Sequence, residues 1–156
     1  MKKIWTLIIA VALPELVGIV STPFIIAAIP NWYKALNKPF FSPPNWIFAP
    51  VWTLLYLMMG VASYLVWQQG IKKQKVRRAL TFYTIQLFLN FVWSWLFFGL
   101  HSPILALIDI VFLWVFIVLT MLKFYKISKP AAYLLFPYLL WVSFASLLNL
   151  AIVILS

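Results

Sequence analysis

Few side chains in this sequence could perform acid–base, metal or nucleophilic chemistry. Glu15 and Asp109 are its only acidic residues, His101 is its only histidine, and it has no cysteine. A single histidine excludes a multi-histidine metal or haem site, and the lack of thiols excludes disulfides and cysteine nucleophiles. We therefore expect no metal and no cofactor, and the residue types do not indicate a hydrolase.

Both carboxyl groups fall inside apolar segments, where an ionised carboxylate costs at least about 2.5–3.5 kcal/mol. Each carboxyl group must therefore be neutral, paired or hydrated. For Asp109 we expect a hydrogen bond between helices that fixes their packing. Glu15 shares a small-residue helix face with Gly18 and Thr22, and it fits either such a hydrogen bond or contact with a ligand or a proton. His101 is expected in a polar turn.

Aromatic side chains make up 19% of the chain and recur with amide groups at three- and four-residue steps in three apolar segments. Residues at these steps share one helix face. The faces are Phe48, Trp52, Tyr56, Met59 and Ser63; Gln86, Asn90, Trp93 and Phe97; and Tyr138, Trp141, Ala145 and Asn149. At any one position packing is a sufficient explanation. Together the three faces predict a pocket for a large, flat, mostly apolar ligand such as a porphyrin or a sterol.

The elements that would position these faces are membrane-spanning helices. Hydrophobic residues make up 66% of the 156 residues and charged residues 9%, which excludes an ordinary water-soluble domain. Crossing a hydrocarbon layer of about 30 Å takes roughly 20 apolar residues per helix. Such segments occur at 4–29, 46–67, 80–99, 103–122 and 130–155. We predict an all-α fold, a single domain over residues 1–156 that forms an integral membrane bundle of five transmembrane helices.

Prolines concentrate in the first helix and in the loop that follows it. Pro14 and Pro23 should bend the helix or free carbonyl groups, so we expect neighbouring helices to cover it. The loop, residues 30–45, combines several prolines with four aromatic residues. Two roles remain open for it: a lid over the end of the bundle, and an aromatic belt at the lipid headgroups.

The basic residues behind the net charge of +10 are distributed as the predicted topology requires. The twelve Lys and Arg residues lie at the ends of the apolar segments, ten on the side of the N-terminus and only Lys34 and Lys38 on the other. The positive-inside rule then places the N-terminus in the cytoplasm and Ser156 outside. Residues 72–78 are expected to contact anionic lipid headgroups of the bilayer, and we expect no nucleic-acid partner. The short ends favour a prokaryotic plasma membrane.

A dense series of short motifs runs along residues 30–150. It comprises Trp32-Tyr33, Lys38-Pro39, Pro43-Pro44, Trp46, Pro50-Val51-Trp52, Leu55-Tyr56, Met59-Gly60, Ser63-Tyr64-Leu65-Val66-Trp67, Gln86-Leu87, Leu89-Asn90, Trp93, Phe97-Phe98-Gly99, Asp109, Pro137-Tyr138-Leu139, Trp141, Phe144-Ala145 and Leu148-Asn149. In content and order these motifs resemble the translocator protein family, also called the tryptophan-rich sensory protein (TspO/MBR) or peripheral benzodiazepine receptor family.

The resemblance implies a five-helix bundle, often a homodimer, that binds porphyrins such as protoporphyrin IX and haem, in some members cholesterol, and synthetic benzodiazepine-type ligands. By the same resemblance, Trp52 and Trp141 match two tryptophans implicated in porphyrin breakdown. The ligand cavity is implied to include Asn90, Trp93, Ala145 and Leu148, to which we add Phe144. The lid and its junction are implied to include Trp32, Pro43, Pro44 and Trp46.

Two positions depart from the family pattern. Phe41 stands where the family commonly has a tryptophan, so the indole donor is lost. Asn149 is followed by Leu150 rather than by the tyrosine and arginine of the sterol motif in animal members, which argues against cholesterol binding through that motif.

The leading hypothesis is a membrane receptor or carrier for sensing or transport of tetrapyrroles. The alternatives are a light- and oxygen-dependent porphyrin-degrading activity and a small structural membrane protein.

Overall fold

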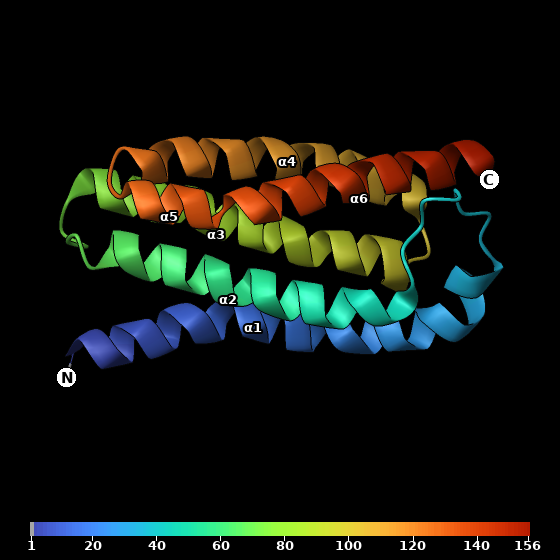
Figure 1. Ribbon diagram of the computed structural model, residues 1–156, viewed down its shortest axis with the longest axis horizontal. Helices are drawn as coiled ribbons and strands as arrows, with labels where there is room; N and C mark the ends of the chain where they lie inside the picture. Colours follow the sequence, from blue (N-terminus) through green and yellow to red (C-terminus); the bar gives the residue numbers. More distant parts are fainter. Residues whose placement is uncertain (1) are drawn as a thin grey trace.

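The computed structural model describes residues 2–156, with side chains from residue 3 onward, as a bundle of long helices (Figure 1). The described residues contain no strand. The elements are α1 (Lys2–Ala28) with a π-helical turn (Ile29–Tyr33), a 3₁₀ turn (Asn45–Ile47) leading into α2 (Phe48–Trp67), α3 (Gln74–Ser94) with a π-helical turn (Trp95–Gly99), α4 (Pro103–Tyr125), α5 (Lys129–Leu134) and α6 (Phe136–Leu155). Five helical segments are long and apolar enough to cross a membrane, as predicted.

Every helix departs from its predicted bounds at one end or both, and two departures have an identifiable cause. α3 begins at Gln74, six residues before the predicted start at 80. The prediction counted only apolar residues, and the first turns of this helix contain Lys75, Arg77 and Arg78. The predicted fifth helix is divided at Leu135 into α5 and α6. Pro137, two residues after Leu135, has no backbone N–H to donate to the preceding turn, and this explains the break.

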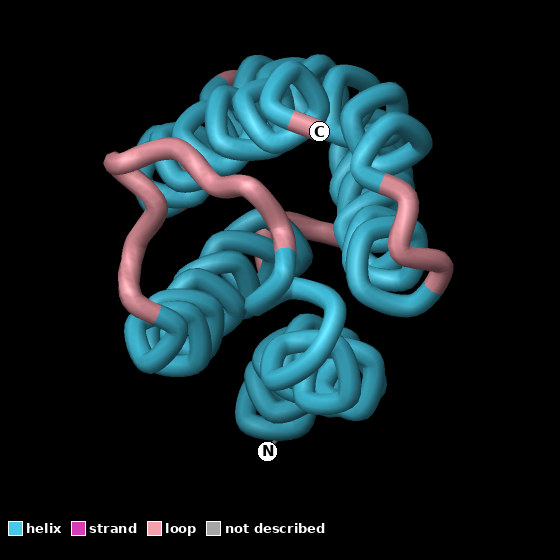
Figure 2. Tube along the Cα trace, turned by 90° about the vertical axis from the view of Figure 1, so that its right-hand side faces the viewer, coloured by secondary structure: helices cyan, strands magenta, loops and turns pink. Residues whose placement is uncertain are grey.

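The helices surround an interior that extends along the bundle. α1 packs beside α2, α2 contacts α5, and α4 lies against α3, α5 and α6. Figure 2 looks along the bundle at the end where the C-terminus lies, and the loop between α1 and α2 crosses this end. Alanines at several contacts, among them Ala62, Ala79 and Ala106, are fully buried. Small residues allow the close van der Waals packing on which helix association in lipid depends.

α1 and α2 touch closely in one half and diverge in the other. A Cβ atom at Gly60 of α2 would lie only 2.6 Å from Val11 Cα, so the absence of a side chain allows this contact. At the next contact between the two helices, a Cβ at Gly18 of α1 would lie 2.9 Å from Tyr56 Cε2 of α2. Beyond that point residues of both helices line an open space, which is described below.

The expectation that neighbouring helices cover the proline defects of α1 holds at Pro14, which is buried, but not at Pro23, which is exposed. Only 17% of the residues in its most apolar stretch are buried, against 33–39% in the other four spans. The helix nevertheless continues through Pro14 and Pro23. Near the second proline, hydroxyl groups of Ser21 and Thr22 donate to backbone carbonyls at 2.8 and 2.7 Å. These carbonyls belong to Val17 and Gly18, in the turn before the Ile19 carbonyl that Pro23 leaves without its helical donor.

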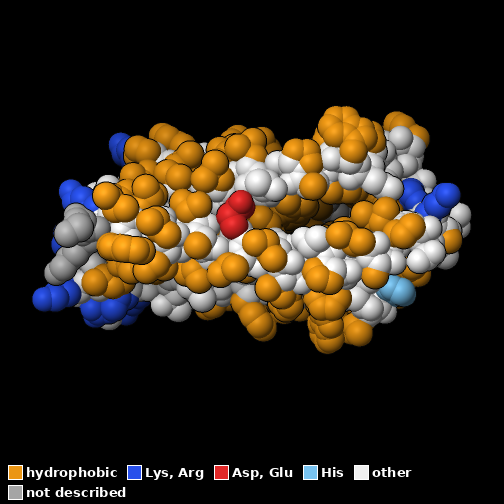
Figure 3. Space-filling view, turned by 90° about the horizontal axis from the view of Figure 1, so that it is seen from below, with side chains coloured by type: hydrophobic (Ala, Val, Ile, Leu, Met, Phe, Trp, Pro, Cys, Tyr) orange, Lys and Arg blue, Asp and Glu red, His pale blue; other side chains and the backbone are white. Residues whose placement is uncertain are grey.

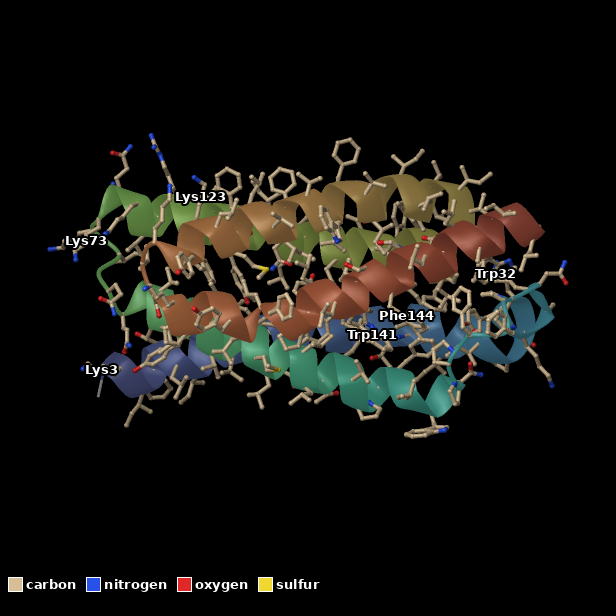
Figure 4. All side chains as sticks on the ribbon, turned by 45° about the horizontal axis from the view of Figure 1, so that its top comes forward. Lys3, Trp32, Lys73, Lys123, Trp141 and Phe144 are labelled. Atoms are coloured by element: carbon tan, nitrogen blue, oxygen red, sulfur yellow. The ribbon has the colours of Figure 1, made fainter. Side chains whose placement is uncertain are left out.

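Basic side chains gather at the ends of the bundle, and the surface between the ends is mostly apolar (Figure 3). Lys3, Lys73 and Lys123 project from one end, whereas Trp32 lies at the other (Figure 4). The chain therefore folds so that the N-terminus and the two most basic loops share one end. This placement agrees with the crossing count made from the sequence.

Candidate functional site

A cavity of about 400 Å³ lies between α1, α2, the end of α3 and α6. Its volume is within the roughly 300–1,000 Å³ that small-molecule sites occupy. The lining residues are Glu15, Gly18, Ile19, Ser21, Thr22, Ile25, Ile26, Ile29, Tyr33, Asn45, Phe48, Ala49, Trp52, Thr53, Tyr56, Trp93, Ser94, Phe97, Phe98, Trp141, Phe144, Ala145, Leu148, Asn149 and Ile152. Eight predicted site residues are among them: Phe48, Trp52, Tyr56, Trp93, Trp141, Phe144, Ala145 and Leu148.

Aromatic rings from α2 and α6 form one wall of the cavity. The ring centroids of Trp52 and Trp141 are 6.5 Å apart and their planes are nearly perpendicular, at 88°. Trp141 also lies 5.6 Å from Phe144 and 6.3 Å from Phe48. Figure 4 shows Trp141 and Phe144 side by side in the middle of the bundle. Edge-to-face packing of this kind holds the rings in place and presents apolar surface to the cavity.

A chain of buried hydrogen bonds joins α2, α3 and α6 beside the cavity. The Tyr56 hydroxyl donates to Asn90 Oδ1 at 2.7 Å, and Asn90 Nδ2 donates to the Tyr138 hydroxyl at 2.9 Å. That hydroxyl donates to Gln86 Oε1 at 2.8 Å, and Gln86 Nε2 lies 3.9 Å from Met59 Sδ. These hydrogen bonds engage the polar groups of Gln86, Asn90 and Tyr138 within the protein. None of the three residues lines the cavity. We call this set the tyrosine–amide network.

A second polar link does reach the cavity. The Trp93 indole donates to Asn149 Oδ1 at 3.0 Å, and Asn149 Nδ2 donates to the backbone carbonyl of Pro103 at 2.9 Å. Both side chains line the cavity. The link ties α3 and α6 to the start of α4 and fixes the orientation of the Trp93 ring.

The loop of residues 34–44 is tied to the bundle end. Lys38 Nζ donates to the carbonyl of Tyr33 at 2.8 Å, and Asn37 Nδ2 donates to the carbonyl of Leu155 in α6 at 3.3 Å. The Phe41 ring lies 6.1 Å from that of Phe144 in the cavity wall. The loop thus contacts the end of α6 and one residue of the cavity.

The predicted lid residues lie outside the cavity lining. These are Trp32, Pro43, Pro44 and Trp46. Trp32 stacks on His101, with centroids 4.6 Å apart and an interplanar angle of 9°. The Trp46 side chain is 73% exposed, as expected for an aromatic residue at the headgroups. Both roles considered for the predicted loop, lid and belt, therefore remain compatible with its placement.

α1 supplies a wall that sequence reasoning largely missed. Its apolar residues Ile19, Ile25, Ile26 and Ile29 line the cavity, yet their type alone does not separate them from lipid-facing residues. The one available signal was the face of Glu15, Gly18 and Thr22, all of which line the cavity.

Near these residues the cavity reaches the outer surface. Ile19 and Ile26 of α1 are 64% and 65% exposed although they line the cavity. Ala49 and Thr53 on the facing side of α2 are also exposed and lining. Figure 3 shows the hollow on this face, with an acidic side chain beside it. The opening between α1 and α2 faces the lipid rather than the end of the bundle.

The two carboxyl groups have different surroundings. Glu15 Oε1 is buried at the cavity without a hydrogen-bond partner. Asp109 Oδ2 is also buried and unpaired, and Asp109 does not line the cavity. The predicted interhelical hydrogen bond of Asp109 is therefore wrong, because the neighbouring Tyr138 hydroxyl donates to Gln86 instead. Among the described residues, no group of three His, Cys, Asp or Glu could hold a metal ion.

Comparison with known proteins agrees with this architecture. The model of the TspO/MBR family matches residues 10–155. The chain is 49% identical to the tryptophan-rich protein TspO of Chlorobaculum tepidum, covering 97% of this chain and 96% of the relative. It is 46% identical to the protein of that name from Archaeoglobus fulgidus, covering 90% of each, and 39% identical to the Homo sapiens translocator protein, covering 87% and 81%. The chain is therefore an integral membrane protein that belongs to the TspO/MBR family.

Proposed function

We propose that the protein is a membrane receptor or carrier that binds porphyrins, such as protoporphyrin IX and haem, in the cavity between α1, α2 and α6. The observation that supports this most directly is the aromatic wall of Trp52, Trp141 and Phe144 facing a space of about 400 Å³. Flat apolar ligands stack on such rings. The names of the relatives, tryptophan-rich sensory protein and translocator protein, fit sensing or transport as the outcome.

The opening between α1 and α2 gives an apolar ligand a direct route from the membrane. Exposed Ile19 and Ile26 on one side and Thr53 on the other border this route. A ligand dissolved in lipid would enter without crossing the loop at the bundle end. Sterols and benzodiazepine-type compounds are further candidate ligands for the same cavity.

The test is a titration of the purified protein with protoporphyrin IX in the dark, following the porphyrin absorption band and tryptophan quenching. Trp52→Phe and Trp141→Phe should each weaken binding by roughly two- to tenfold, because aromatic pairs contribute about 0.5–1.5 kcal/mol. Trp114→Phe is the matched control, since Trp114 donates to Ser143 and does not line the cavity. Absence of saturable binding, or unchanged affinity in both cavity variants, would refute the proposal.

A second candidate function is light- and oxygen-dependent breakdown of the bound porphyrin. It is favoured by one observation: the Trp52 and Trp141 rings, 6.5 Å apart, both border the cavity. Illumination of the complex in air should then bleach the porphyrin faster than illumination of porphyrin alone. Replacing both tryptophans by phenylalanine should abolish the difference. Equal bleaching with and without protein would exclude this activity.

We also propose an orientation and an assembly for the protein. The end that carries Lys3, Lys73 and Lys123 would face the cytoplasm of a prokaryotic plasma membrane, where anionic headgroups attract basic loops. The opposite end, with Ser156, would lie outside. A homodimer in the bilayer is expected from the family resemblance, and its test is crosslinking in native membranes.

A further inference from the structure

Glu15 is the only acidic or basic side chain among the residues that line the cavity in the described part of the chain. It lies near the middle of α1, so it is placed within the span rather than at the headgroups. Its Oε1 atom is buried and has no hydrogen-bond partner. A carboxylate held at this depth without a partner is costly, which makes its position in a cavity informative.

The described residues around Glu15 do not supply the missing partner. The nearby Tyr56 hydroxyl already donates to Asn90 at 2.7 Å. Ser21 and Thr22 donate to backbone carbonyls of their own helix. Lys38, at the bundle end, donates to three backbone carbonyls. The carboxylate therefore faces a space whose occupant is free to provide a donor or a positive charge.

We propose that the cavity contains a subsite for organic cations, in which Glu15 pairs with the ammonium group of a flat aromatic ligand. This inference rests on the cavity that is proposed above as the ligand site. The aromatic wall supports it independently of the carboxylate, because the faces of tryptophan and tyrosine rings attract cations. Trp52, Trp141 and Tyr56 line the same space as Glu15.

The proposal makes the cavity selective by charge as well as by shape. An ammonium group that donates to the carboxylate supplies a positive charge beside Glu15, and none of the residues that line the cavity carries one. A ligand of the same shape without that group leaves the carboxylate unpaired. An anionic group has to lie away from Glu15, so a dianionic porphyrin gains nothing from this residue.

The experiment uses two pyrenes of nearly equal shape, 1-pyrenemethylammonium and neutral 1-ethylpyrene. Their dissociation constants are measured by tryptophan-to-pyrene energy transfer with the wild-type protein, Glu15→Gln and Asp109→Asn. Each probe partitions into detergent to the same extent with every protein, so a comparison of the ratio of the two constants between proteins cancels partitioning. Asp109→Asn is the matched control, because it removes the other buried, unpaired carboxyl group, which lies outside the cavity lining.

In the wild-type protein the cation should bind more tightly than its neutral analogue. In Glu15→Gln the advantage should fall by roughly tenfold to a hundredfold, as expected for loss of a charge-assisted hydrogen bond. Asp109→Asn should keep the advantage, and 1-ethylpyrene should bind all three proteins, which shows that they are folded.

The outcomes separate this inference from the function on which it rests. If protoporphyrin IX and 1-ethylpyrene bind but Glu15→Gln leaves the ratio unchanged, the cation subsite is refuted and the porphyrin site stands. An equal loss in Asp109→Asn also refutes it, because the effect would then be one of overall charge. If no probe and no porphyrin binds the wild-type protein, both proposals fail.

Discussion

Replacement of Asn90 by leucine is expected to lower stability while changing ligand affinity little. Asn90 accepts from Tyr56 at 2.7 Å and donates to Tyr138 at 2.9 Å, and leucine of similar size removes both hydrogen bonds without a large void. Hydrogen bonds between membrane helices are worth about 0.6 kcal/mol on average and about 1.7 at most. The two bonds therefore predict a loss of about 1.2–3.4 kcal/mol in the free energy of unfolding.

The assay is unfolding in mixed micelles of detergent and sodium dodecyl sulfate, followed by tryptophan fluorescence. A double-mutant cycle with Tyr56→Phe should give a coupling of about 0.6–1.7 kcal/mol between the two residues. Thr84→Val on the same helix is the control, because its hydroxyl is exposed and bonds only to its own helix. Additive effects of Tyr56→Phe and Asn90→Leu would refute the network as a stabilising unit.

The same variant also tests the role of the amide. The structure leaves Asn90 outside the cavity lining, so protoporphyrin IX should bind Asn90→Leu with less than a tenfold change, which corresponds to about 1.4 kcal/mol. A larger loss of affinity would show that the amide contacts the ligand, as the family resemblance implies.

Three further changes probe the helix packing, the end loop and the orientation. Gly60→Ala should destabilise the protein by about 1–3 kcal/mol, because its Cβ would lie 2.6 Å from the α1 backbone, and wild-type stability in micelles would contradict that contact. Asn37→Ala removes the bond between the end loop and the Leu155 carbonyl, and because the proposed ligand route between α1 and α2 does not cross that loop, stopped-flow association and dissociation rates should stay within about twofold of wild type; rates faster by roughly two- to tenfold would contradict that route. Because the chain has no native cysteine, Lys3→Cys and Ser156→Cys report topology directly: an impermeant maleimide should label only the second in intact cells, and the reverse pattern would invert the orientation.

The sequence was sufficient to predict the helices and their faces. Five apolar segments predicted the five spans, because span length and hydropathy are local properties of the chain. Three- and four-residue spacing placed Phe48, Trp52 and Tyr56 on one helix face, and all three line the cavity. Lys and Arg positions correctly indicated which loops share an end, since each crossing reverses the chain direction.

Only the tertiary structure decided what the polar residues do. Gln86 and Asn90 were predicted on a face of the ligand pocket, but tyrosines from α2 and α6 bond to the Asn90 amide oxygen and nitrogen and to Gln86 Oε1. That assignment depends on which helices are neighbours, and helical periodicity contains no such information. The same reason explains Asp109, whose Oδ2 atom is buried without the hydrogen bond between helices that the sequence predicted.

The cavity itself is also a result of tertiary packing. α1 and α2 approach closely at Gly60 and separate farther along, so that isoleucines such as Ile25 become part of a wall. In lipid, an isoleucine facing a neighbour and one facing the acyl chains are equally apolar, and no sequence pattern separates them. The sequence thus determined the spans and the aromatic faces, whereas the distances between helices decided which of those faces enclose a space.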